Sequence, residues 1–112
     1  MRATLKAIDP DAARMNKTEA SFNAQLTVLK KAGRIQWFMF EGLKLRLGHT
    51  CFYTPDFIAL DDAGKLIAYE VKGFWRDDAR VKIKVAARAY PWIRFVAVKK
   101  IKGGFDSEDI KP

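Results

Sequence analysis

A strand, a helix and a second strand follow one another in the C-terminal half of the sequence, and this order restricts the fold more than any other feature. The apolar segment "LIAYEVKG" (66–73) is typical of a buried strand, as is "IRFVAVKK" (93–100). Between them, "DDARVKIKVAARAY" (77–90) has a helical pattern that starts with aspartates and is followed by Pro91. Because two strands joined through a helix suit a parallel crossover, we predict a mixed sheet with helices packed over it.

The N-terminal half supplies another helix and more extended chain. Thr18 is placed to cap a helix through "EASFNAQLTVLKKA" (19–32), and Gly33 is a natural stop. Aromatic and β-branched residues then indicate extended chain over 35–47. A bend or bulge near Glu41-Gly42 would make this one long bent strand or two.

A hairpin completes the sheet. "CFYTPDFIAL" (51–60) is predicted to be a strand that pairs antiparallel with 66–73 around the turn "DDAGK". Residues 1–15 are predicted to be an arm, and 103–112 a polar, mobile tail. Residues 16–102 then form one α/β domain, a mixed α+β sheet in the order α-β-β-β-α-β.

Charge indicates the partner. The chain of 112 residues carries 21 Lys and Arg against 13 Asp and Glu, a net charge of +8, which should attract nucleic acid. No apolar run approaches the roughly 20 residues that span a bilayer, so we expect no membrane contact. The N-terminus lacks the apolar core of a secretory signal, and the single Cys51 rules out an intrachain disulfide. These features favour a reducing, cytoplasmic compartment.

Polar residues interrupt both strands of the hairpin. Pro55 and Asp56 lie within the first strand, and Glu70 and Lys72 lie within the second. Since side chains alternate along a strand, Glu70 and Lys72 share a face, and pairing could bring Asp56 beside Glu70. Two carboxylates and a lysine favour a hard divalent cation and phosphodiester hydrolysis. The alternative is a polar residue after proline and a solvated strand face, which the apolar surroundings make less convincing.

The spacing of these residues resembles a known family. Pro55-Asp56, followed fourteen positions after Asp56 by Glu70-Val71-Lys72, resembles the PD-(D/E)XK motif of the restriction-endonuclease-like nuclease superfamily. The wider phrase "NKTEASF…YTPDF…YEVKG" is similar to small phage-encoded endonucleases that resolve branched, Holliday-junction-like DNA. The resemblance covers roughly residues 16 to 100.

The resemblance implies a metal site and a reaction. It implies Mg²⁺, or Mn²⁺ as a substitute, held by Glu19, Asp56, Glu70 and the carbonyl of Val71. Lys72 would assist the attacking water, so the implied catalytic residues are the three carboxylates and this lysine. For Glu19 the alternative is a first-turn glutamate favoured by the helix dipole.

The second predicted helix carries a basic stripe at four-residue spacing, which places its members along one face. We name it the basic stripe: Arg76, Arg80, Lys84 and Arg88. With no carboxylates interleaved on the helix, these cations repel one another, and contact with DNA phosphates would relieve the repulsion. The alternative is an ordinary solvated helix face.

Other chemistry-bearing residues are weaker candidates. Phe74 and Trp75 follow the motif directly; packing is favoured over stacking on a base or wedging a branch. Nothing positions His49 or Cys51 for catalysis, so both are interpreted as structural.

The sequence therefore favours a metal-dependent DNA endonuclease, and the resemblance implies that it acts on branched DNA in phage DNA metabolism and recombination. The alternative is a non-catalytic, basic DNA-binding or packaging accessory protein with the same fold. Resolving enzymes of the similar phage group act as dimers, so a homodimer is a further expectation.

Overall fold

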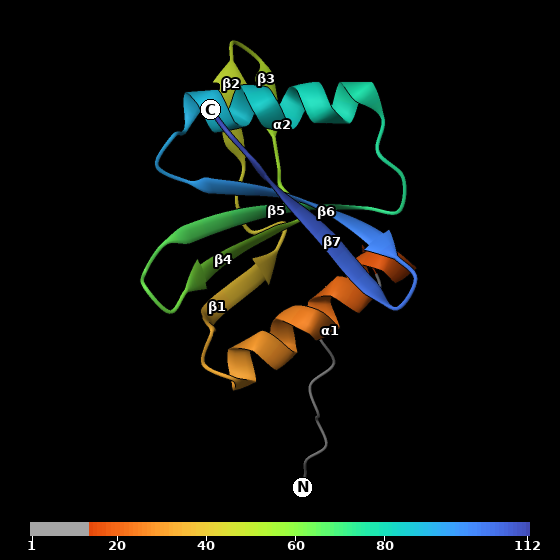
Figure 1. Cartoon of the computed structure of the whole chain (residues 1–112). Helices are drawn as coiled ribbons and strands as arrows, with labels where there is room; N and C mark the ends of the chain where they lie inside the picture. Colours follow the sequence, from red (N-terminus) through yellow and green to blue (C-terminus); the bar gives the residue numbers. More distant parts are fainter. Residues whose placement is uncertain (1–13) are drawn as a thin grey trace, which may run out of the picture.

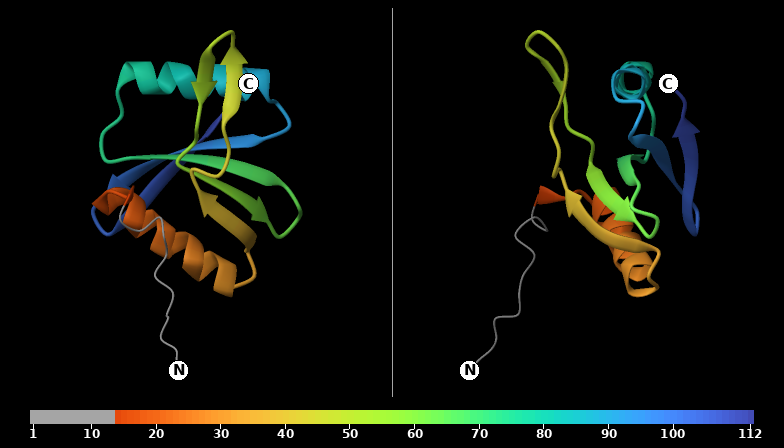
Figure 2. Two further views of the ribbon diagram at one scale, coloured as in Figure 1. Left: turned by 180° about the vertical axis from the view of Figure 1, so that it is seen from behind. Right: turned by 90° about the vertical axis from the view of Figure 1, so that its left-hand side faces the viewer.

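The computed structural model describes residues 14–112, in which a central sheet has a helix on each face (Figure 1). The five-stranded sheet has the order β1-β4-β5-β6-β7; β5 and β6 are parallel and the other neighbours antiparallel. Helix α1 covers one face, and α2 covers the other together with a small β2-β3 hairpin (Figure 2). The elements are α1 (Lys17–Lys31), β1 (Ile35–Phe40), β2 (Leu45–Gly48), β3 (Cys51–Tyr53), β4 (Phe57–Asp61), β5 (Leu66–Lys72), α2 (Asp77–Ala89), β6 (Arg94–Ile101) and β7 (Gly104–Ile110). The predicted mixed sheet and its parallel crossover through α2 are confirmed.

Helix α1 begins earlier than the sequence suggested. Asn16 caps it: its side chain accepts a hydrogen bond from the Glu19 backbone N–H at 2.8 Å, and the Glu19 side chain accepts one from the Asn16 N–H at 3.0 Å. The predicted cap at Thr18 is therefore wrong, because Asn16 and Glu19 have the reciprocal three-residue spacing of a capping box. The end at Gly33 is confirmed, where a φ of 80° needs glycine.

The extended segment after α1 is two strands. Glu41 has a φ of 50° and forms the bend between β1 and β2. A Cβ on Gly42 would lie 2.8 Å from the Met39 side chain, so glycine allows a close approach there. The expected break near Glu41-Gly42 is confirmed.

The segment 51–60 is also two strands, where one was predicted. Tyr53 ends β3, which pairs with β2, and Phe57 begins β4, which pairs with β1 and β5. The break falls at Thr54-Pro55-Asp56, since proline has no N–H for a ladder hydrogen bond. The antiparallel β4-β5 hairpin itself is confirmed.

The C-terminal segment differs from the prediction. Residues 104–110 form β7, which pairs antiparallel with β6 along its whole length, so the predicted polar tail is wrong. Gly103, with a φ of 81°, lies in the turn between them. Most β7 side chains are exposed at a sheet edge, which explains why the sequence shows no apolar alternation there. The predicted N-terminal arm, residues 1–15, lies almost wholly outside the described residues.

Two apolar clusters hold the layers together. On the α1 face, the Phe22 ring makes edge contacts with Phe57, Tyr69 and Phe105, with centroids 5.6, 5.0 and 5.2 Å apart. On the α2 face, Ile83 packs among residues of the sheet and of the β2-β3 hairpin. Both faces of the central strands are therefore buried, which fixes the hairpin that carries Asp56 and Glu70. No helix in residues 14–112 is long and apolar enough to cross a bilayer.

Candidate active site

The β4-β5 register places Asp56 opposite Glu70. Phe57 pairs with Tyr69, so the next position outward sets Asp56 against Glu70. In an antiparallel pair, opposite residues project to the same face. Both side chains are buried, with only 7% of Asp56 and 8% of Glu70 exposed. The structure thus brings together the two carboxylates that the sequence placed on neighbouring strands.

Each carboxylate accepts a hydrogen bond from a neighbouring group of the site. The Val71 N–H donates to Asp56 Oδ2 at 2.7 Å, and the Tyr53 hydroxyl donates to Glu70 Oε1 at 2.7 Å. The Lys72 ammonium lies 3.0 Å from Glu70 Oε2. The predicted same-face pair of Glu70 and Lys72 is therefore formed. Charge-assisted hydrogen bonds of this kind fix the orientation of both carboxylates.

Burial and charge perturb the titration of the site. Burial, and next the charge of Glu70, raise the pKa of Asp56 to about 7. Burial and then Glu70 also raise the pKa of Tyr53, so its hydroxyl remains a donor. Burial alone would lower the pKa of Lys72, but attraction to Glu70 outweighs it and the pKa is raised. Lys72 is therefore a cation at neutral pH, whereas Asp56 is close to its titration midpoint.

Stability should fall with rising pH because of Asp56. Its pKa of about 7 lies above the ordinary 3.8, so the folded protein binds more protons than the unfolded chain between those values. Ionisation of Asp56 then lowers the free energy of unfolding as pH rises from about 4 to 7, by up to about 1.4 kcal/mol per pH unit. Urea unfolding from pH 4.5 to 7.5 should show this slope in the wild type and its loss in Asp56→Asn. Parallel curves for the two proteins would contradict it.

The donor set fits a hard divalent cation. Asp56 Oδ1 accepts no hydrogen bond from residues 14–112, although the side chain is buried. A cation there would satisfy this oxygen and reduce the repulsion between the carboxylates, and carboxylate oxygens are the ligands that Mg²⁺ prefers. Lys72 now supplies part of that compensation by pairing with Glu70.

Glu19 lies near the site but binds elsewhere. Its charge contributes to the raised pKa of Asp56, and a Cβ on the neighbouring Gly73 would lie 3.8 Å from the Thr18 hydroxyl, so the first turn of α1 is close. Its carboxylate, however, caps Asn16. Within the described part of the chain, no three His, Cys, Asp or Glu side chains form a group able to hold a metal ion. The ligand roles of Glu19 and of the Val71 carbonyl stay predictions.

Tyr53 is the site residue that sequence reasoning missed. It is 6% exposed, and its hydroxyl donates to Glu70 Oε1 while Lys72 pairs with Oε2. The sequence feature that could have identified Tyr53 is its position three residues before Asp56, in "YTPDF". A hollow of ≈ 320 Å³ lined by Tyr53, Thr54, Glu70 and three α2 residues opens beside this contact. Those α2 residues are Asp78, Ala79 and Lys82.

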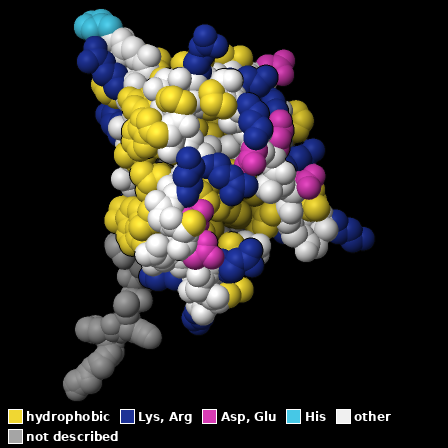
Figure 3. Space-filling model, turned by 60° about the vertical axis from the view of Figure 1, so that its left-hand side comes forward, with side chains coloured by type: hydrophobic (Ala, Val, Ile, Leu, Met, Phe, Trp, Pro, Cys, Tyr) yellow, Lys and Arg dark blue, Asp and Glu magenta, His cyan; other side chains and the backbone are white. Residues whose placement is uncertain are grey.

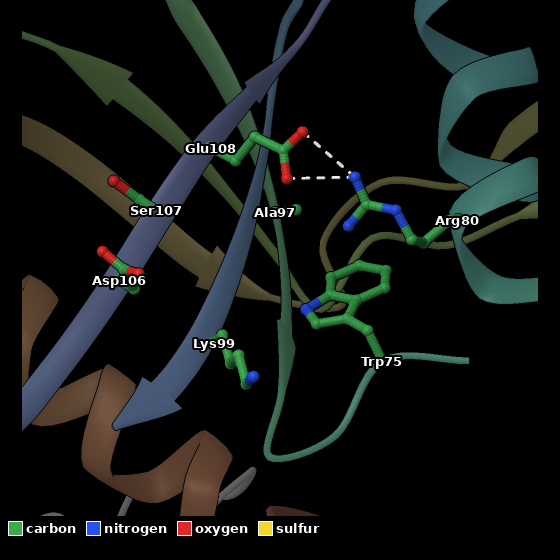
Figure 4. A pocket seen from close by; sticks show the side chains of 7 residues that line it. All are labelled: Trp75, Arg80, Ala97, Lys99, Asp106, Ser107 and Glu108. Carbon is green, nitrogen blue, oxygen red and sulfur yellow. Dashed lines mark hydrogen bonds and ion pairs between the residues drawn. The ribbon is translucent and has the colours of Figure 1, made fainter. Parts of the chain in front are cut away.

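The basic stripe is only partly available to a polyanion. Glu108 on β7 binds Arg80 through both carboxylate oxygens at 3.0 Å, and the Arg80 guanidinium lies 5.7 Å from the Trp75 ring centroid (Figure 4). The expected self-repulsion of the stripe is therefore relieved at Arg80 by a carboxylate on β7, a strand that the sequence pattern does not predict. The other three members are exposed and make no ion pair with any residue of the described chain: Arg76, Lys84 and Arg88. Lys and Arg side chains also prevail over acidic ones on the face in Figure 3.

Comparisons with known proteins place the chain in no family. No protein-family model and no curated protein matches it. Among solved structures it is similar to a protein described as "Crystal structure of SSO0001", with a TM-score of 0.48 and 16% sequence identity. The similarity covers 83% of this chain and 50% of that one, so the chain spans half the length of that protein.

Proposed function

We propose that this protein is a Mg²⁺-dependent DNA endonuclease with a restriction-endonuclease-like core, acting on branched DNA in phage DNA metabolism. The observation that carries the proposal is the buried pair of Asp56 and Glu70, with Lys72 held 3.0 Å from Glu70. Burying two carboxylates side by side costs folding free energy, and such arrangements are typical of functional sites. Neither an ordinary strand face nor a purely structural ion pair needs two adjacent buried carboxylates.

The residues have separate roles in this proposal. Asp56 and Glu70, with the Val71 carbonyl, would hold Mg²⁺ or Mn²⁺. When bound, the ion supplies charge neutralisation at the phosphoryl oxygens and a lower pKa for water. Tyr53 holds Glu70 in one orientation through its 2.7 Å hydrogen bond. Lys72, which stays protonated, stabilises negative charge that develops on the phosphate.

A nuclease assay tests the function directly. Purified protein is incubated with supercoiled plasmid and with a four-way junction, each with Mg²⁺, Mn²⁺ or chelator. We expect nicked or linear products only with metal, and preference for the junction over a linear duplex. DNA binding without cleavage under every metal condition would instead favour the non-catalytic DNA-binding alternative, which the net charge of +8 also supports.

The exposed part of the basic stripe should set the salt dependence of binding. Each phosphate contact contributes about 0.9 to the slope of log K against log salt concentration on duplex DNA. The double substitution Lys84→Ala/Arg88→Ala should therefore reduce the slope by about 2, because two contacts are lost. Glu108→Gln should increase binding at low salt by releasing Arg80. Fluorescence anisotropy of a labelled duplex in chelator measures both effects.

Lys31→Ala is the matched control for the salt slope. This lysine is also exposed and near a helix C-terminus, but it lies on α1, across the sheet from α2. Its removal should leave the slope nearly unchanged. A slope reduction by Lys31→Ala equal to half of that of the double basic-stripe substitution would show that DNA responds to net charge alone.

A further inference from the structure

Phe74 is a large apolar side chain left in solvent beside the candidate active site. It is 76% exposed, the highest value among the large hydrophobic residues of the described chain. Its ring contacts no other aromatic ring there. It follows Lys72 by two positions, so the two Cα atoms are at most about 7 Å apart. A phosphate next to Lys72 would therefore place its nucleotides within reach of this ring.

The loop that carries Phe74 is anchored on both sides. Before it, Lys72 pairs with Glu70, and after it the Trp75 indole N–H donates to the Val98 carbonyl at 3.3 Å. Trp75 turns inward from the loop toward β6 and β7, where it lines a hollow of ≈ 210 Å³ (Figure 4). Two adjacent aromatic residues thus differ: the prediction of packing is confirmed for Trp75 and is wrong for Phe74. With the loop anchored on both sides, Phe74 is left in solvent.

The surroundings of Phe74 suit a nucleic acid strand. The loop from β5 to α2 runs along one side of the molecule, between the start of α1 and the start of α2 (Figure 1). Gly73 is exposed and Arg76, two residues after Phe74, is an exposed cation. An aromatic ring flanked by Lys72 and Arg76 combines a stacking surface with charges for the backbone, the pairing that single-strand binders use.

We propose that Phe74 stacks on an unpaired base next to the phosphate at the active site, so that the substrate class is DNA with single-stranded or branch-point nucleotides. The inference rests on the proposed function for the position of the phosphate. In continuous duplex each base face is covered by its neighbours, and the ring would have to unstack a step, which offsets the gain. At a gap, flap or junction the base face is already free, and stacking gives a net gain.

A binding experiment in chelator tests this without cleavage. The probe is a gapped duplex with 2-aminopurine in the single-stranded gap, and the comparison is a continuous duplex of equal length. Phe74→Ala should weaken binding to the gapped probe by about 5- to 150-fold, the range for loss of one base stack. It should also abolish the fluorescence quench, while affinity for continuous duplex changes less than about twofold. Phe74→Trp should retain both the affinity and the quench.

Trp92→Ala is the matched control, since Trp92 is 59% exposed but lies beyond the far end of α2. It should bind both probes as the wild type does. Unchanged affinity of Phe74→Ala for the gapped probe, or equal losses on gapped and continuous duplex, would overturn the proposal. Because the binding assay contains no metal, it measures stacking independently of cleavage. A stacking effect in a protein that cleaves no DNA in the metal-containing assay would therefore support this inference while contradicting the proposed function. Thermal unfolding of Phe74→Ala should match the wild type, because the ring buries little area.

Discussion

Asp56→Asn is expected to lower metal-dependent DNA cleavage by at least about 100-fold, the scale of losing one group that stabilises transition-state charge. Asparagine has nearly the same shape, and its amide oxygen can still accept the Val71 N–H that now binds Asp56 Oδ2. The substitution removes the charge that burial and Glu70 oppose. Stability at pH 7.5 should therefore stay equal or rise while activity is lost. Plasmid nicking rates and thermal unfolding on the same preparation measure both.

The matched control is Asp62→Asn, which removes an exposed carboxylate from the β4-β5 turn. It should change neither cleavage nor stability appreciably. Metal-dependent cleavage by Asp56→Asn at the wild-type rate would exclude Asp56 from the proposed active site. If Asp56→Asn lost activity only because the protein unfolded at the assay temperature, Asp56 would instead have a structural role.

Phe57→Ala should destabilise the fold by about 3–5 kcal/mol, the cost of emptying a buried aromatic site. Phe57 is fully buried. Its ring centroid lies 5.6 Å from that of Phe22 on α1 and 5.3 Å from that of Phe40 on β1. It is also the first residue of β4, next to Asp56. Loss of its packing therefore weakens the strand end that positions the carboxylate. Urea unfolding measures the change in free energy.

Phe57→Leu retains most of the buried volume and should cost clearly less than Phe57→Ala. Phe74→Ala gives the opposite comparison, since the same chemical change at a ring 76% exposed should leave stability nearly unchanged. If both alanine variants were equally stable, the α1 face of the sheet would not be packed as described.

Much of the fold follows from local pattern, and each error has its own physical cause. The crossover from β5 through α2 to β6 was predicted because apolar strands and an amphipathic helix have distinct periods. β7 was missed because an edge strand with exposed polar side chains carries no such period. The α1 cap was misplaced by two residues because both Asn16 and Thr18 can serve, and only the reciprocal bond with Glu19 decides between them.

The candidate site was predictable in its residue types and less so in its contacts. Proline and carboxylates inside apolar strands identified Asp56 and Glu70, and strand alternation predicted the pair of Glu70 with Lys72. The register, and hence the adjacency of the carboxylates, came only with the structure. The Tyr53 hydrogen bond and the Arg80–Glu108 pair depend on where β3 and β7 lie. Such tertiary contacts leave no local pattern.

Within residues 14–112, the side chains that bind Glu70, and Asp56 beside it, all lie between Tyr53 and Lys72 in the sequence. The β4-β5 reversal, in which Asp61 accepts hydrogen bonds from the Ala63 and Lys65 N–H groups, brings Asp56 beside Glu70 and Lys72, and Tyr53 precedes Asp56 by three residues. A short loop costs little entropy to close, so these groups assemble and disperse together. The amide hydrogens of β4 and β5 therefore report on the carboxylate pair: while they resist exchange with solvent, Asp56 and Glu70 stay side by side.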